Sequence, residues 1–329
     1  MILASSPADF ASAYKDNCFS FEELDPSETV EVFFYDESEE VVGVRRYEGV
    51  ESVATSPKAL LLRRLSPEPV ESSVCGFVQP SARTASLAVE YNDGDDMTPF
   101  ILFTSAHHDC EPNAPMGAEE QWRTISSGEC DEMAFCLNEG GFVKASLVVG
   151  GTSRALIGAY VAPAKCMALF VLNADYILSR GLLPEGCEEF DVTFSIGGTL
   201  SNTIHYRLKE SHPSDVRLAW LNEWGGVSYH TFHRPVGQKL LSKRKVCETP
   251  SGSVVMGVES WIESTLDSGM LSEGESHHLA ELLASPRVWC RGTEGFEPQI
   301  ITSSEATMLG GELRRVSLTI RPAKRVFNS

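Results

Sequence analysis

The 329-residue sequence predicts a mainly β protein with several domains, built as β-sandwich-like units that each carry a short helix. Two observations predict this fold class. Most apolar segments are short and alternate with polar residues at a period of two, which is typical of half-buried strands. Glycine pairs such as Gly150-Gly151 and Gly197-Gly198 separate these segments. They indicate hairpin turns, where a positive φ favours glycine.

The first domain is expected over residues 1–115, with residues 1–20 as an N-terminal arm. The acidic stretch 36–40 predicts the turn of a hairpin, and Ser56-Pro57 predicts the start of a short helix that Pro67 ends. The strands predicted for this domain cover residues 29–35, 41–44, 85–91 and 100–104.

The second domain is expected over residues 116–215, where a similar order of elements returns. Asn173 is positioned to cap a short apolar helix that closes at Gly181. The strands predicted here cover residues 142–149, 155–160 and 190–196. Gly43 and Gly158 are 115 residues apart, and Pro67 and Pro184 are 117 apart. This near-constant offset indicates an internal duplication. The alternative is a chance match, since strand–turn–strand–helix–strand is a common order.

The third domain is expected over residues 216–329, as an aromatic hinge followed by a β-sheet with one covering helix. The hinge is Val216–Pro235, and Asn222 with Gly225-Gly226 predicts a turn inside it. Ser272 and Glu275 match a capping box that starts a helix, which Ser285-Pro286 ends. The predicted strands cover residues 253–262, 298–302 and 312–320.

Charge divides the chain at this hinge. Residues 1–215 hold 14 Lys and Arg against 34 Asp and Glu, whereas residues 216–329 hold 13 against 12. The overall net charge of −19 argues against nucleic-acid binding and against anionic membrane surfaces. No stretch approaches the ~20 apolar residues of a membrane-spanning helix, so no membrane insertion is expected.

The cysteines and the N-terminus predict the compartment. Nine scattered cysteines without a C-x-x-C pair indicate reduced, mostly buried thiols. The first ten residues lack a basic segment and a sustained apolar run, so no signal peptide is expected. We therefore expect synthesis in a reducing cytoplasm.

Three polar groups of the sequence are candidates for reactive or metal-binding sites. His107–Glu111 and Glu129–Glu132 are rich in metal-binding residue types. Neither has the ligand spacing of zinc or calcium sites, so a polar loop and a solvated acidic turn are favoured. The glycine pairs form no dinucleotide-binding or phosphate-binding loop. His230 or His233 with an acidic partner would suit a hydrolase, but no nucleophile motif accompanies them. We expect no catalytic residues, no cofactor and no metal.

The hinge aromatics have three interpretations. Trp and Tyr are favoured at protein interfaces, where they bury a large rigid area and keep a polar group. Exposed rings would instead suit a carbohydrate-binding β-sandwich module, and the third interpretation is a domain core. The interface or glycan candidates are Trp220, Trp224, Tyr229, Phe232, His230 and His233.

Short motifs resemble tail and baseplate-type structural proteins of Bacteroides-type phages and prophages. The hinge carries the Leu-Asn-x-x-Gly-Gly turn as Leu221–Gly226, and the C-terminal third carries Leu-x-x-Leu-Leu-x-Ser-Pro-x-Val as Leu279–Val288. Gly43–Tyr47 and Gly49, ahead of Ser56-Pro57, look similar too. The resemblance implies a non-enzymatic virion component of the tail, tail tip or baseplate. It also implies homo-oligomers, other tail or baseplate proteins as partners, and a location in the virion after synthesis in the bacterial cytoplasm.

Overall fold

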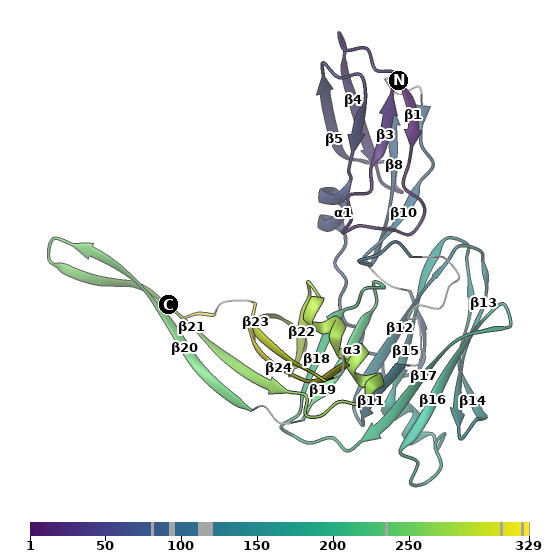
Figure 1. The fold of residues 1–329 in the computed structure, drawn as a ribbon, viewed down its shortest axis with the longest axis vertical. Helices are drawn as coiled ribbons and strands as arrows, with labels where there is room; N and C mark the ends of the chain where they lie inside the picture. The colour runs from purple at the N-terminus through teal and green to yellow at the C-terminus, as the bar shows by residue number, and fades with distance from the viewer. Residues whose placement is uncertain are drawn as a thin grey trace.

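The computed structural model describes residues 1–79, 82–91, 96–110, 121–233, 236–309, 312–323 and 326–328. Strands make up most of this part of the chain, in several sheets, and the three helices are short. The predicted fold class, mainly β and multidomain with short helices, is confirmed. Figure 1 shows an upright N-terminal unit, a β-rich body beneath it, and a long hairpin that projects from the body.

The first unit is a β-sandwich over residues 1–65 and 82–110. Its buried side chains include Phe19, Phe21, Phe34 and Phe103. Its small sheet has the order β1 (Ile2–Ser5), β3 (Phe19–Glu22), β6 (Val53–Thr55). Its large sheet has the order β2 (Ala11–Ser12), β10 (Ile101–Thr104), β8 (Thr84–Tyr91), β4 (Thr29–Tyr35), β5 (Val41–Glu48), with β9 (Asp96–Met97) beside β8. Helix α1 (Lys58–Arg64) follows β6.

The second unit is also a sandwich. Its large sheet has the order β11 (Gln121–Ser126), β17 (Thr199–Lys209), β16 (Glu189–Ile196), β13 (Gly141–Val149), β14 (Thr152–Ala162). Its small sheet has the order β12 (Cys130–Leu137), β15 (Cys166–Asn173), β7 (Gly76–Val78). Helix α2 (Ala174–Ser179) begins after Asn173, whose side chain accepts a hydrogen bond from Tyr176 N, as the sequence predicts.

The two sandwiches repeat one strand order. In each large sheet the outermost strand pairs in parallel with the last strand of the unit, β2 with β10 and β11 with β17. In each small sheet an antiparallel pair, β3 with β6 and β12 with β15, is followed directly by the helix. The duplication that the glycine and proline offsets indicate is therefore visible in the topology.

One strand departs from this repeat. After α1 the chain leaves the first unit, adds β7 to the small sheet of the second unit, and returns to the first unit as β8. The sequence places the boundary between the first two domains at residues 115 and 116, and it does not predict that β7 joins the second unit. Its sequence, Gly76-Phe77-Val78, is too short to show a period.

The third unit is an antiparallel sheet covered by α3 (Glu273–Ala284). Its order is β19 (Val227–Phe232), β18 (Val216–Leu221), β22 (Val288–Gly292), β23 (Gly295–Leu309), β24 (Glu312–Pro322), β21 (Gly252–Asp267), β20 (Gly237–Thr249), with β25 (Val326–Asn328) beside β21. The capping box of Ser272 and Glu275 is confirmed. The sequence did not predict β20, which forms one side of the projecting hairpin.

Gly158 gives a direct test of packing in the second unit. A Cβ atom at this position would lie 2.8 Å from Phe170 Cε2, inside the closed core. We expect Gly158→Ala to lower the free energy of unfolding by about 1–3 kcal/mol, because a packed ring must move. Gly141→Ala is the control, since a Cβ there meets nothing within 4 Å. Urea denaturation of both variants would contradict the expectation if they unfolded at the same midpoint.

Candidate functional site

Three carboxylates at and just before the start of β12 lie where the three units meet. Glu129, Asp131 and Glu132 are exposed by 6%, 2% and 2%. We call them and their arginine partners the charged junction. The solvated acidic turn expected from the sequence is therefore wrong for this segment.

Each carboxylate is paired with an arginine from a different part of the chain. Arg83, just before β8, pairs with Glu132 and also donates to the Glu68 carbonyl. Arg123 of β11 lies 2.8 Å from Asp131 Oδ2, and Arg217 of β18 lies 2.8 Å from Glu129 Oε2. The pairs connect the first unit to the second, close the second on itself, and connect the third to the second.

Neutral donors complete the hydrogen bonding of these carboxylates. Tyr206 donates to Asp131 at 2.8 Å, and Thr231 donates to Glu129 at 2.6 Å. Glu132 accepts from the Val227 backbone N–H at 2.6 Å and from the Tyr229 hydroxyl at 3.2 Å. Burial alone would raise the pKa of Asp131, but the Arg123 guanidinium outweighs it and holds that pKa below its usual value.

The hinge aromatics lie on the hairpin that carries Arg217 of the charged junction, and Tyr229 contacts the junction directly. The hinge is the hairpin β18–β19, and the Asn222 side chain accepts from the backbone N–H of Trp224 and of Gly226 in its turn. Trp220 is fully buried and Tyr229 is 2% exposed. The carbohydrate-binding alternative requires exposed rings, and Trp220 and Tyr229 are not exposed. Phe232 is buried as well, and Trp224 is half-buried against the core of the second unit.

The two hinge histidines lie in different surroundings. His230 is buried edge-on against Phe232, and burial lowers its pKa well below the usual value, so it is neutral. His233 lies at the exposed end of the hairpin, 3.2 Å from Asp215. A burial this complete leaves little of the His230 ring open to solvent.

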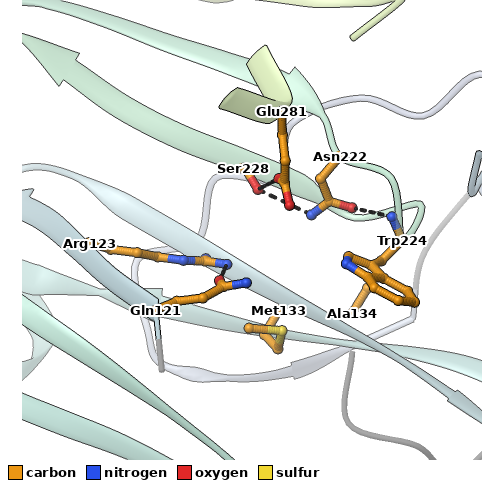
Figure 2. Close-up of a pocket in the computed structure, with 8 residues that line it drawn as sticks. All are labelled: Gln121, Arg123, Met133, Ala134, Asn222, Trp224, Ser228 and Glu281. Atoms are coloured by element: carbon orange, nitrogen blue, oxygen red, sulfur yellow. Dashed lines mark hydrogen bonds between the residues drawn. The ribbon is translucent and has the colours of Figure 1, made fainter. Parts of the chain in front are cut away.

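A small pocket lies beside the junction (Figure 2). Glu281 of α3 reaches in from one side and Arg123 from the other, and Asn222, Ser228 and Trp224 line the space between them. Its volume of about 10 Å³ has room for one water molecule, which is too small for a substrate. Burial raises the pKa of Glu281 to about 7 although Arg123 acts in the opposite direction.

The polar loop of residues 107–110 has a packing role. Asp109 accepts hydrogen bonds from Ser12 N and Asn17 Nδ2 and pairs with Lys15 at 2.9 Å. The His107 backbone N–H donates to the Glu223 carbonyl, which joins this loop to the hinge turn. Glu111, the fifth residue of the motif, lies outside the described residues. Among the described residues, no group of three or more His, Cys, Asp and Glu is placed to hold a metal ion.

The most exposed element of the described chain is the hairpin β20–β21, which we call the arm (Gly237–Asp267). Figure 1 shows that it extends well beyond the rest of the third unit. β24 pairs with β21 only from Ser264 to Asp267, and β25 pairs with it from Val258 to Ser260. β20 is the last strand of the sheet in the described structure, so its outer edge faces no strand of this chain.

The arm has an uncovered apolar face. Leu266 is fully buried beneath α3, and Ser264 and Ile262 follow it on the same side of β21. Ile262 pairs with Leu240, and both are at least half exposed. The core face of the sheet therefore continues along the arm beyond its cover. The large apolar side chains exposed on the arm are Leu240, Leu241, Val246, Val254, Val255, Met256 and Ile262.

The opposite face of β20 is basic. Lys239, Lys243 and Lys245 alternate along it, and Arg244 lies between them on the apolar face. Against these four cations β20 has one acidic residue, Glu248, while β21 adds Glu259 and Glu263 opposite Lys243 and Lys239 and Asp267 at its end. Lys245 is 3.4 Å from the buried Glu259 of β21, so part of this charge is compensated inside the arm.

Comparisons with known proteins give little direct support for a function. No family model and no curated protein matches the sequence. A chain from the virion of a native gene transfer agent particle is similar over 36% of this chain and 99% of its own length. The two are 13% identical with a TM-score of 0.21, which is too low to carry an inference. None of the described helices is long and apolar enough to cross a bilayer.

Replacing Arg83 tests the junction. We expect Arg83→Met to lower the free energy of unfolding by about 3–5 kcal/mol, since it leaves the Glu132 carboxylate buried without its cation. Arg46→Met is the matched control, because the Arg46–Glu31 pair is largely exposed and solvent screens it, so its loss should change stability little. Chemical denaturation compares the two, and equal small losses would contradict a structural role for the junction.

Glu281 predicts a pH dependence of stability. Its pKa rises from 4.5 to about 7 on folding, so folding favours its protonated form. Its contribution is complete below about pH 4.5 and is lost as the pH rises to about 7. We expect Glu281→Gln to remove a decline of up to about 3 kcal/mol over this window. Denaturation curves of wild type and variant that stay parallel from pH 4.5 to 7 would contradict this.

Proposed function

We propose that this protein is a non-enzymatic structural component of a phage tail, tail tip or baseplate, or of a tail-derived particle. It acts through contacts between subunits. The observation that carries the proposal is the arm, which presents an apolar face that is continuous with a buried core and is left uncovered by the part of the chain that the structure describes. Exposed apolar surface of this kind marks an interaction site.

The charged junction supports the same function. A building block transmits force only if its domains keep a fixed relative orientation. Here Arg83 and Arg217 connect the first and third units to carboxylates of the second, inside a buried region. The carboxylates of Glu129–Glu132, which are candidates for metal binding by residue type, therefore hold the three units together.

The repeated sandwiches and the hinge motif supply the more specific part of the proposal. Repeated β-units with open sheet edges suit an assembly that adds identical subunits. The turn Leu221–Gly226 and the helix end Leu279–Val288 resemble tail and baseplate-type proteins, so we expect tail partners rather than another type of particle. The partners proposed are further copies of this chain and other tail proteins.

Shortening the arm tests this function. Residues 246–256 are replaced by Asn-Gly, which joins Lys245 to Gly257 through a two-residue hairpin turn. This keeps the Lys245–Glu259 pair and the strand β25 contacts. We expect light scattering to show oligomers or polymers for the wild type and monomers for the shortened protein, with unchanged thermal unfolding.

The control keeps the length of the arm and changes apolar exposure elsewhere. Leu156→Thr with Val161→Thr removes two exposed apolar side chains from β14 and should leave assembly unchanged. A wild-type protein that stays monomeric at its highest soluble concentration, with and without other tail proteins, would contradict the proposed function.

A further inference from the structure

We infer that the arm of one copy docks on the outer end of the first unit of a second copy. This inference rests on the proposed assembly function and names the surface that the arm contacts. It combines three observations: the basic and apolar arm, an acidic end of the first unit, and their separation within one chain.

The first unit carries the most acidic stretch of the sequence, and half of its carboxylates lie at the outer end of the unit, opposite the β4–β5 turn. Residues 16–51 contain 12 Asp and Glu and two Arg, and no Lys or Arg occurs from residue 16 to residue 44. The turn after β3, the end of β5 and the segment after it lie together, because Leu24 N donates to the Glu51 carbonyl and Thr29 pairs with Glu48. The exposed carboxylates gathered there are Glu22, Glu23, Asp25, Glu28, Glu48 and Glu51.

This end also offers apolar contact. Ile2 of β1 pairs with Glu22 of β3 and is 53% exposed. An exposed apolar side chain beside an exposed carboxylate complements an arm that carries leucine and valine on one face and lysine on the other. Apolar contact would supply affinity, and the charges would supply specificity and a faster association.

The charges of the edge strand disfavour a second arm as the docking partner. Lysines along an open edge strand discourage pairing with an identical strand, because like charges would lie directly opposite. The four cations of β20 therefore select an acidic surface. The first unit provides one, whereas the rest of the third unit is close to neutral.

Geometry makes the contact intermolecular. In Figure 1 the N-terminal unit and the arm project from the body in different directions, and the arm tip lies far from the end that carries the N-terminus. Each copy thus has one donor element and one acceptor surface at separate places. Contacts of this heterologous kind join copies head to tail and produce a closed ring or an open filament.

A charge exchange tests the contact. Lys243→Glu with Arg244→Glu reverses the arm, and Glu23→Lys with Glu51→Lys reverses the acceptor. We expect each double variant alone to self-associate at least about tenfold more weakly than the wild type, because like charges then face each other. Mixing the two variants should restore association, since the reversed arm meets the reversed acceptor.

The matched control is Glu185→Lys with Glu188→Lys, which makes the same change in net charge at an exposed turn of the second unit. Sedimentation velocity at low and high salt measures all five samples, after thermal unfolding has shown that every variant is folded. The control should associate like the wild type, and added salt should weaken wild-type association.

Each outcome is decisive. If the wild type assembles and the arm variant assembles equally well, the docking inference fails while the assembly function stands. If the control is as weak as the acceptor variant, net charge rather than this contact governs association, and the inference fails. If the wild type stays monomeric and binds duplex DNA through Lys243 and Arg244, the arm is a nucleic-acid contact and both proposals fail.

Discussion

Three buried ion pairs on one short segment hold this molecule together. Glu129, Asp131 and Glu132 each place a negative charge where little water reaches, which costs several kcal/mol per ion unless a cation and further donors compensate. The compensating arginines come from β11, from β18 and from the segment before β8. The carboxylates can therefore be buried only when all three units are in place. The relative positions of the units follow from this requirement as much as from apolar packing.

The sequence predicted much of the fold because local patterns determine it. Alternating strands, the Asn173 cap, the Ser272 capping box and the hinge turn at Asn222 are set by neighbouring residues, and the structure has all of them. The repeat was visible because glycine and proline occupy equivalent positions in two copies. Gly43 lies against Leu60 of the first unit, and Gly158 lies against Phe170 of the second.

The parts that the sequence did not predict depend on distant partners. Glu132 and Arg83 are 49 residues apart, so the local sequence around Glu132 indicates a solvated acidic turn and gives no sign of its buried cation. Trp220 and Tyr229 were open to interpretation as exposed rings until their burial was known. The sequence does not predict β20, the first strand of the arm, because its residues do not alternate regularly between apolar and polar. The candidate contact surface was thus the least predictable part of the chain.

The exchange of β7 has a consequence for the order in which the chain folds. A ribosome releases residues 76–78 before it has made β15, their pairing partner at residues 166–173. The first sandwich can close once β10 has emerged, and it then holds a loop whose strand awaits a sheet that does not yet exist. When the second sandwich forms, β15 pairs with β7, and this strand then links the two sandwiches. A chain cut between the two sandwiches would leave β7 without a sheet in the first part and β15 with an unpaired edge in the second.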